Sequence, residues 1–232
     1  MKKIFYLSLT FFYLSAHAQD DRAKMDWPNL KKYADSNKLL PPKMPAEKRV
    51  VFMGNSITEG WKRADSSFFA NREFIDRGIS GQTTPQMLLR FRPDVIDLKP
   101  DAVVILAGIN DIAENTGPIT LEAVFGNIVS MAELAKANNI KVLLCSVLPA
   151  NTFPWRLEIK PAEKVISLNA MLETYAKKNN LTYVNYYPAM VDDEKGLDKR
   201  YTKDGVHPTL EGYKIMDALV VAAIKKTLKR KK

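Results

Sequence analysis

Short apolar runs alternate along the chain with longer segments in which apolar residues recur at helical spacing. The apolar runs lie at residues 49–53, 74–77, 101–106, 141–147 and 182–186. Strands of a parallel sheet that is covered on both faces are continuously apolar, and the third and fourth runs fit this pattern best. The alternation predicts βαβ units, and therefore a single three-layer α/β domain with a parallel sheet of about five strands.

Four segments between these runs have the apolar spacing of helices. Three are long, at residues 120–137, 161–179 and 209–228. The first begins with Thr120, whose hydroxyl can accept hydrogen bonds from free N–H groups of the first turn. A shorter helix is expected at residues 85–91, interrupted near Pro93 because proline lacks an N–H donor and clashes with the preceding turn.

The first 18 residues have the pattern of a secretory signal peptide. Lys2 and Lys3 precede a mostly apolar stretch, and Ala16-His17-Ala18 gives the small-x-small cleavage pattern before Gln19. The stretch is shorter than the roughly 20 residues of a spanning helix, although an uncleaved membrane anchor is the alternative interpretation. The pattern predicts a protein exported to the periplasm or beyond, with no integral membrane segment after cleavage.

The remainder of the chain divides into a leading segment at residues 19–47, in which a short helix would end at Pro41-Pro42, and one domain at residues 48–232. No internal repeat or long linker divides this domain, which is long enough to bury a well-formed core. Cys145 has no second cysteine to pair with. Because it lies in an apolar run, we expect a buried, inert thiol.

The formal net charge is +9, and much of it lies in the tail at residues 225–232. A basic tail can bind nucleic acid or an anionic membrane. No aromatic residues interleave with these charges, so a solvated helix end is favoured and no nucleic-acid partner is expected. Asp192, Asp193 and Glu194 are likewise expected to form a solvated loop, since adjacent carboxylates alone do not make a coordination cage.

Four polar or glycine-rich stretches follow predicted strands, at residues 54–58, 78–83, 108–111 and 204–207. Each alone has an ordinary explanation as a turn or a helix cap. In open α/β sheets, however, functional sites lie beyond the carboxyl ends of the strands. The common position of all four stretches therefore indicates one site.

His207 is the only histidine outside the predicted signal peptide. A hydrolase with an imidazole base thus has no other candidate in the mature chain. Asp204 precedes it by three residues, and Ser56 lies on the turn after the first predicted strand. A serine, a histidine and an acid are the parts of a serine-nucleophile site.

In these four blocks and their order, the chain resembles the SGNH hydrolases, the GDSL-type lipases, esterases and acylhydrolases. The family has a serine block, a glycine block, a Gly-x-Asn-Asp block and an Asp-x-x-His block, found here between Gly54 and His207. The serine block reads Gly-Asn-Ser-Ile where many members have Gly-Asp-Ser-Leu. An α/β-hydrolase is disfavoured, because Thr58 stands where Gly-x-Ser-x-Gly would have its second glycine.

The resemblance implies a flavodoxin-like α/β/α fold and an esterase that needs no metal or cofactor. Ser56 would be the nucleophile, His207 the base, and Asp204 the acid that orients the imidazole. The oxyanion hole would consist of the backbone N–H groups of Ser56 and Gly81 and the side-chain amide of Asn110. Asp111 would shape the loop without reacting.

The loop at residues 148–156 follows the fourth predicted strand and should border the same site. Trp155 is a candidate to stack on a sugar ring or line an acyl pocket, and Arg156 to meet an acidic group. Equally, the loop could be a rigid one that packs Trp155 over the sheet edge. The leading functional hypothesis is hydrolysis of a small acyl ester, with O-deacetylation of a carbohydrate first. The alternatives are a lysophospholipase or short-chain lipid acylhydrolase, and a noncatalytic glycan-binding module.

Overall fold

The computed structural model describes residues 26–71 and 73–229. The predicted signal peptide at residues 1–18 lies outside the described residues. Five parallel strands form one sheet in the order β2-β1-β3-β4-β5. They are β1 (Val50–Gly54), β2 (Phe74–Gly78), β3 (Ala102–Leu106), β4 (Lys141–Cys145) and β5 (Thr182–Val184). This confirms the predicted fold class.

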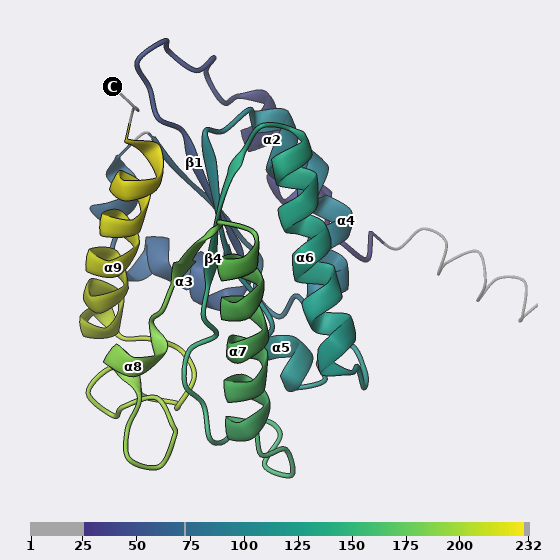
Figure 1. Ribbon diagram of the computed structural model, residues 1–232, viewed down its shortest axis with the longest axis vertical. Coiled ribbons are helices and arrows are strands. Elements are labelled where there is room, and N and C mark those ends of the chain that lie inside the picture. The colour runs from purple at the N-terminus through teal and green to yellow at the C-terminus, as the bar shows by residue number, and fades with distance from the viewer. Residues whose placement is uncertain (1–25, 72, 230–232) are drawn as a thin grey trace, which may run out of the picture.

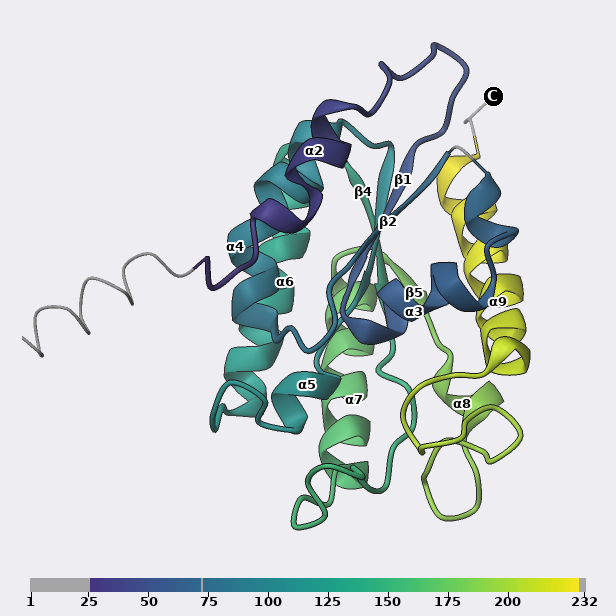
Figure 2. The same ribbon diagram turned by 180° about the vertical axis from the view of Figure 1, so that it is seen from behind.

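Helices cover both faces of the sheet (Figure 1). One layer contains α2 (Lys31–Lys38), α4 (Thr84–Asp94), α5 (Ile109–Ile112), α6 (Leu121–Ala137) and α7 (Ala162–Lys178). The other contains α3 (Ser56–Ala64), α8 (Tyr187–Met190) and α9 (Leu210–Leu228), and the reverse view in Figure 2 shows the same separation. Two 3-10 turns, η1 (Phe68–Ala70) and η2 (Ile96–Leu98), complete the elements of the described chain.

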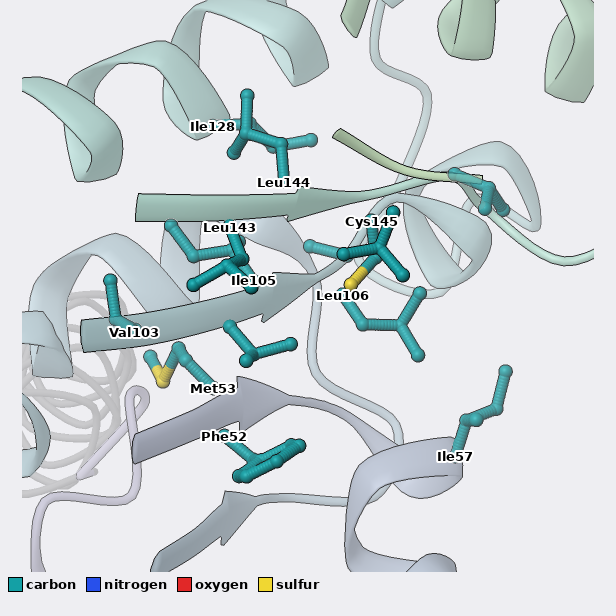
Figure 3. Packing of buried hydrophobic residues seen from close by; sticks show 14 of the residues in the cluster. Phe52, Met53, Ile57, Val103, Ile105, Leu106, Ile128, Leu143, Leu144 and Cys145 are labelled. Atoms are coloured by element: carbon teal, nitrogen blue, oxygen red, sulfur yellow. The ribbon is translucent and has the colours of Figure 1, made fainter. Parts of the chain in front are cut away.

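The core lies on the two faces of the central strands. Every residue of β1 and β3 is buried, as expected for strands covered on both sides. Figure 3 shows the side chains of Met53, Ile105 and Leu143, which extend from the neighbouring strands β1, β3 and β4 and belong to the buried cluster. Cys145 belongs to this core and is only 2% exposed. The expected burial of this cysteine is confirmed, and burial raises the pKa of its thiol to about 12.

Helix starts follow the local sequence signals. The Thr120 hydroxyl accepts from the N–H of Ala123 at 3.2 Å, as predicted, and Thr209 caps α9 in the same way. The break expected near Pro93 falls at the end of α4, which continues through Pro93 to Asp94. The N–H that proline lacks would have bonded the carbonyl of Leu89, an exposed residue where water can substitute.

The last two strands are shorter than predicted, because the N–H groups of Val147 and Tyr186 donate to side chains and not to a neighbouring strand. The Ser146 hydroxyl accepts from the N–H of Tyr186 at 2.9 Å, which ends β5. The N–H of Val147 donates to the Asn169 side chain at 2.7 Å, which ends β4. A continuous apolar run therefore extends beyond the strand it contains.

The leading segment is attached to the domain by polar contacts from α2. The Tyr33 hydroxyl donates to the carbonyl of Gly78, at the end of β2. Lys32 Nζ lies 2.9 Å from Glu59 Oε1 on α3, and Asn37 accepts from Arg77 Nε at 2.9 Å. Within the described ranges, no helix has the length and apolar character needed to cross a membrane.

Candidate active site

Ser56 is the first residue of α3, directly after a tight turn at the carboxyl end of β1. The Asn55 side chain caps the helix by accepting from the N–H of Ile57 at 3.3 Å. A Cβ atom on Gly54 would lie 1.9 Å from Thr58 Oγ1 and 3.0 Å from the carbonyl oxygen of Leu106. The turn therefore requires glycine at this position, and it places Ser56 at the sheet edge where the other motifs end.

His207 and Asp204 meet Ser56 in a continuous line of hydrogen bonds. Ser56 Oγ lies 2.9 Å from His207 Nε2, and His207 Nδ1 lies 2.7 Å from Asp204 Oδ2. When Nδ1 donates to the carboxylate, Nε2 is free to accept the serine proton. The structure thus brings together the three residues that the sequence singled out, in the geometry of a nucleophile with its base.

The loop that holds the acid and the histidine is fixed by its own backbone. Asp204 Oδ1 accepts from the N–H groups of Val206 at 2.9 Å and His207 at 2.8 Å. Gly205 adopts the left-handed conformation, with φ of 83°, which glycine allows without strain. Partial burial acts to raise the pKa of Asp204, but the bonds from His207 and Val206 hold it below its ordinary value. The carboxylate is therefore charged at neutral pH.

The expected oxyanion donors lie around the same cavity. Gly81 has φ of 78° and Asn110 is 4% exposed on α5. Asn110 Nδ2 donates one of its two hydrogens to the carbonyl of Gln82 at 2.9 Å, which orients the amide. The cavity measures about 700 Å³, and its lining residues are Ser56, Gly60, Arg63, Ala64, Ser80, Gly81, Asn110, Asn115, Trp155, His207, Pro208 and Tyr213.

The segment that carries Gly81 is held in place from α3. Glu59 accepts from the backbone N–H of Ser80 at 2.9 Å and from the Ser80 hydroxyl. Its other carboxylate oxygen pairs with Lys32 of α2. One acidic side chain thereby ties the helix that starts at Ser56 to the loop before Gly81.

Asp111 ties two other elements together behind the site. Its carboxylate accepts from the N–H of Thr84 at 2.9 Å and from the Thr84 hydroxyl at 2.6 Å, joining α5 to the start of α4. Burial raises the pKa of Asp111 to about 6, against the lowering effect of these bonds. The position fits the expectation that Asp111 shapes the loop.

Arg90 forms an inner network that the sequence did not reveal. Its side chain is fully buried and donates to the carbonyl of Gly54 at 2.9 Å, to Gln82 Oε1 at 2.5 Å and to Asp94 Oδ2 at 2.9 Å. It therefore connects the serine turn with Gln82, the residue that orients Asn110. An arginine on an amphipathic helix is usually solvent-exposed, so the sequence offered no signal for this role.

Of the two candidate substrate contacts, Trp155 lines the cavity and Arg156 does not. Trp155 lines the cavity, with its ring centroid 6.2 Å from that of His207, and it stacks on Phe153 at 5.3 Å. Arg156 does not line this cavity; it donates to the carbonyl of Glu114 at 3.1 Å and lies 3.6 Å from Glu158. The spacing within the loop placed both beside the site but could not tell which side chain faces it.

Three other residues that line the cavity were not predicted from the sequence, although their helical spacing from Ser56 could have indicated them. Gly60, Arg63 and Ala64 follow Ser56 by four, seven and eight positions, so they share its face of α3. Across residues 26–71 and 73–229, no cluster of three or more His, Cys, Asp or Glu side chains could hold a metal ion. Asp192, in the acidic stretch, accepts instead from the N–H groups of Glu194 and Gly196 in a turn.

Known proteins resemble this chain over most of its length. The model of the GDSL-like lipase/acylhydrolase family matches residues 52–215. A GDSL-like lipase from Bacteroides thetaiotaomicron is 60% identical, with a TM-score of 0.85 over 88% of this chain and 100% of that one. A protein from Bacteroides fragilis is 55% identical, with a TM-score of 0.87 over 89% of this chain and 100% of that one.

A more distant relative carries a more specific description. The acetylxylan esterase of Xylanibacter ruminicola is 27% identical over 76% of this chain. The match spans only 43% of the length of that relative.

Proposed function

Because the chain belongs to the GDSL-like lipase/acylhydrolase family, we propose that it is a carboxylic ester hydrolase with Ser56 as its nucleophile. The observation that carries the proposal is the line of hydrogen bonds from Asp204 through His207 to Ser56. These contacts lie at the wall of one cavity that is open to a substrate. A serine in contact with a neutral imidazole is activated for attack on a carbonyl carbon.

In the acylation half of the reaction, His207 Nε2 takes the hydroxyl proton as Ser56 Oγ bonds to the ester carbonyl carbon. The carbonyl oxygen becomes an oxyanion, which accepts from the N–H groups of Ser56 and Gly81 and from the second amide hydrogen of Asn110. The tetrahedral intermediate collapses when the C–O bond to the alcohol breaks. His207 donates its proton to the departing alkoxide, which leaves an acyl group on Ser56.

In the second half, water takes the place of the alcohol. His207 Nε2 accepts a proton from the water as its oxygen attacks the acyl carbon, and a second oxyanion forms at the same donors. The bond to Ser56 Oγ then breaks and His207 returns the proton to the serine. Asp204 stays ionised throughout and stabilises the imidazolium that forms in each half.

The proposed substrate is a small acyl ester of a carbohydrate, and the leading reaction is O-deacetylation. Three observations support it. The cavity is bordered by the half-exposed indole of Trp155, a surface on which a sugar ring can stack. The lining residues contain no Leu, Ile, Val, Met or Phe that would bind a long acyl chain. A relative at 27% identity is an acetylxylan esterase. The signal-like pattern at residues 1–18 supports export as part of the same proposal.

The test is an activity panel of acetylated sugars, p-nitrophenyl esters of graded acyl length, and lysophospholipids. We expect acetyl esters to be hydrolysed best. Ser56→Ala and His207→Ala should each lower kcat by about 10⁴-fold or more, and the double variant should be little worse, because the two residues act as a unit. Ser130→Ala is the matched control, since its hydroxyl bonds only within α6.

Three outcomes would contradict all or part of the proposal. Losses that simply multiply in the double variant would mean that Ser56 and His207 do not share a mechanism. Turnover that never exceeds that of Ser56→Ala, combined with binding of acetylated sugars, would favour a glycan-binding module. A preference for lysophospholipids would keep the esterase but replace the carbohydrate substrate.

A further inference from the structure

A positive side chain lies in the cavity two helical turns from the nucleophile. Ser56, Gly60 and Arg63 share one face of α3, and all three line the cavity. With a rise of about 1.5 Å per residue, the Cα atoms of Ser56 and Arg63 are separated by roughly 10 Å along the helix axis. The cavity floor thus runs along α3 from a nucleophile at one end to a guanidinium at the other.

The charge of Arg63 is not neutralised by the protein. Its side chain has no hydrogen bond or ion pair with any residue in the described part of the chain. Neighbouring charges are paired: Glu59 with Lys32, and Asp65 with Lys214. Apart from His207, Arg63 is the only ionisable cation among the residues that line the cavity, and no carboxylate lines it.

Gly60 lies between Ser56 and Arg63 on this face of α3 and has no side chain that would fill the cavity. A Cβ atom at this position would lie 2.9 Å from the Tyr213 hydroxyl and 4.0 Å from Arg63 Nη2. The Tyr213 hydroxyl itself donates to the carbonyl of Ile57 at 2.8 Å, so its ring is fixed as a wall. Trp155 also lines the cavity and is 45% exposed. The space between Ser56 and Arg63 is therefore bordered by aromatic surface and by backbone.

We propose that the site selects esters whose alcohol carries an anionic group, which Arg63 binds while the ester lies at Ser56. The inference rests on the proposed function, whose substrate class it narrows. A guanidinium presents a planar fork of donors that matches a carboxylate or phosphate. Ser56 and Arg63 both line the cavity of about 700 Å³, which is large enough to hold a sugar ring. With Trp155 alongside, the favoured substrate is an O-acetylated acidic sugar.

The experiment compares two matched pairs of acetyl esters. The first pair is an O-acetylated methyl glucuronoside and its uncharged glucuronamide. The second is acetylglycerol phosphate and acetylglycerol, which carries the same negative charge on a smaller alcohol. The measurement is kcat/KM from acetate release at low salt, together with binding of all four esters to full-length Ser56→Ala by calorimetry.

We expect the wild-type protein to prefer the glucuronoside over its amide by about tenfold, the usual size of one charge-assisted contact. Arg63→Gln should bring this ratio close to one, and Arg63→Lys should restore part of it. Lys62→Gln is the matched control, because Lys62 is the adjacent cation on α3 but does not line this cavity. It should keep the wild-type ratio. Added salt should weaken the preference in the wild type.

The outcomes separate this inference from the proposed function. Equal rates on acid and amide in the wild type, with Ser56→Ala inactive, would overturn the inference and leave the esterase intact. No hydrolysis of any ester, with Arg63-dependent binding of the acid to Ser56→Ala, would overturn the proposed reaction and support the anion contact. A preference seen only in the glycerol pair would overturn the assignment to an acidic sugar.

Discussion

Arg90 and Asp94, one turn apart on α4, form an ion pair that is buried away from water. The two side chains are 0% and 2% exposed, and Arg90 Nη1 lies 2.9 Å from Asp94 Oδ2. Arg90→Met would leave the carboxylate buried with one remaining side-chain donor, Asn37 Nδ2 at 2.9 Å. The same change would leave Gln82 Oε1 without the Arg90 donor and would remove one of two donors to the Gly54 carbonyl, which also accepts from the N–H of Ile79.

The expected loss in the free energy of unfolding follows from the buried groups that lose Arg90 as a partner. Removing one member of a buried pair costs about 3–5 kcal/mol, and each unsatisfied buried acceptor adds about 1–3 kcal/mol. We therefore expect Arg90→Met to lower the free energy of unfolding by at least about 4 kcal/mol. This is a large part of the roughly 5–15 kcal/mol that stabilises a typical domain.

A second ion pair on a helix provides the control. Lys38 and Asp35 on α2 lie 3.5 Å apart with side chains 77% and 92% exposed, so Lys38→Met should change stability by less than about 1 kcal/mol. Urea denaturation followed by circular dichroism gives both values. The double variant Arg90→Met/Asp94→Leu should recover at least about 2 kcal/mol relative to Arg90→Met, because it removes the uncompensated charge. A cost for Arg90→Met as small as that of Lys38→Met, or a double variant no more stable than the single, would refute this reasoning.

Two further predictions concern a glycine and a buried acid. Gly78→Ala should destabilise the protein by about 3 kcal/mol, because its Cβ would lie 2.2 Å from the N atom of Glu59 and 2.7 Å from the carbonyl oxygen of Asn55. Gly126→Ala, with no heavy atom within 4 Å, should stabilise α6 by about 0.5–1 kcal/mol; equal shifts in the two denaturation midpoints would contradict both. Because the pKa of Asp111 is raised to about 6, above the value of about 3.9 in an unfolded chain, the folded state holds this proton more tightly. Stability should fall as pH rises from about 4 to 6. The Asp111→Asn variant should not show this fall in stability with pH. If the pH–stability curves of the wild type and the variant run parallel, Asp111 is not the cause of the fall.

The features that sequence predicted well are set by neighbouring residues. Thr120 and Thr209 cap their helices through N–H groups three positions away, and the apolar runs at β1 and β3 match strands that are buried on both faces. The four motifs could also be placed together, because parallel strands deliver their carboxyl ends to one edge of the sheet. Each of these features is determined by residues close in the sequence or by the topology of the sheet.

What the sequence could not supply depends on contacts between distant segments. The buried Arg90 side chain bonds to the Gly54 carbonyl, 36 residues away in the sequence. Arg156 turns from the cavity because the carbonyl of Glu114, 42 residues away, accepts its guanidinium, and Arg63 provides the positive charge there instead. Neither partner is visible in a local pattern. The attachment of α2 through Tyr33 and Gly78 is of the same kind, with 45 residues between the two.

The two hydrogen bonds of His207 span very different lengths of chain. Its partner Asp204 is three residues away, whereas Ser56 is 151 residues away. A ribosome completes the turn at Ser56 and the segments of Gly81 and Asn110 long before it adds the loop at Asp204–His207. Under the proposed function, a chain interrupted before that loop would carry the nucleophile and the oxyanion donors without a base, and so would not hydrolyse esters. Ester hydrolysis would then require synthesis and docking of the loop at Asp204–His207, in the last eighth of the chain, so the onset of activity would be a direct probe of folding.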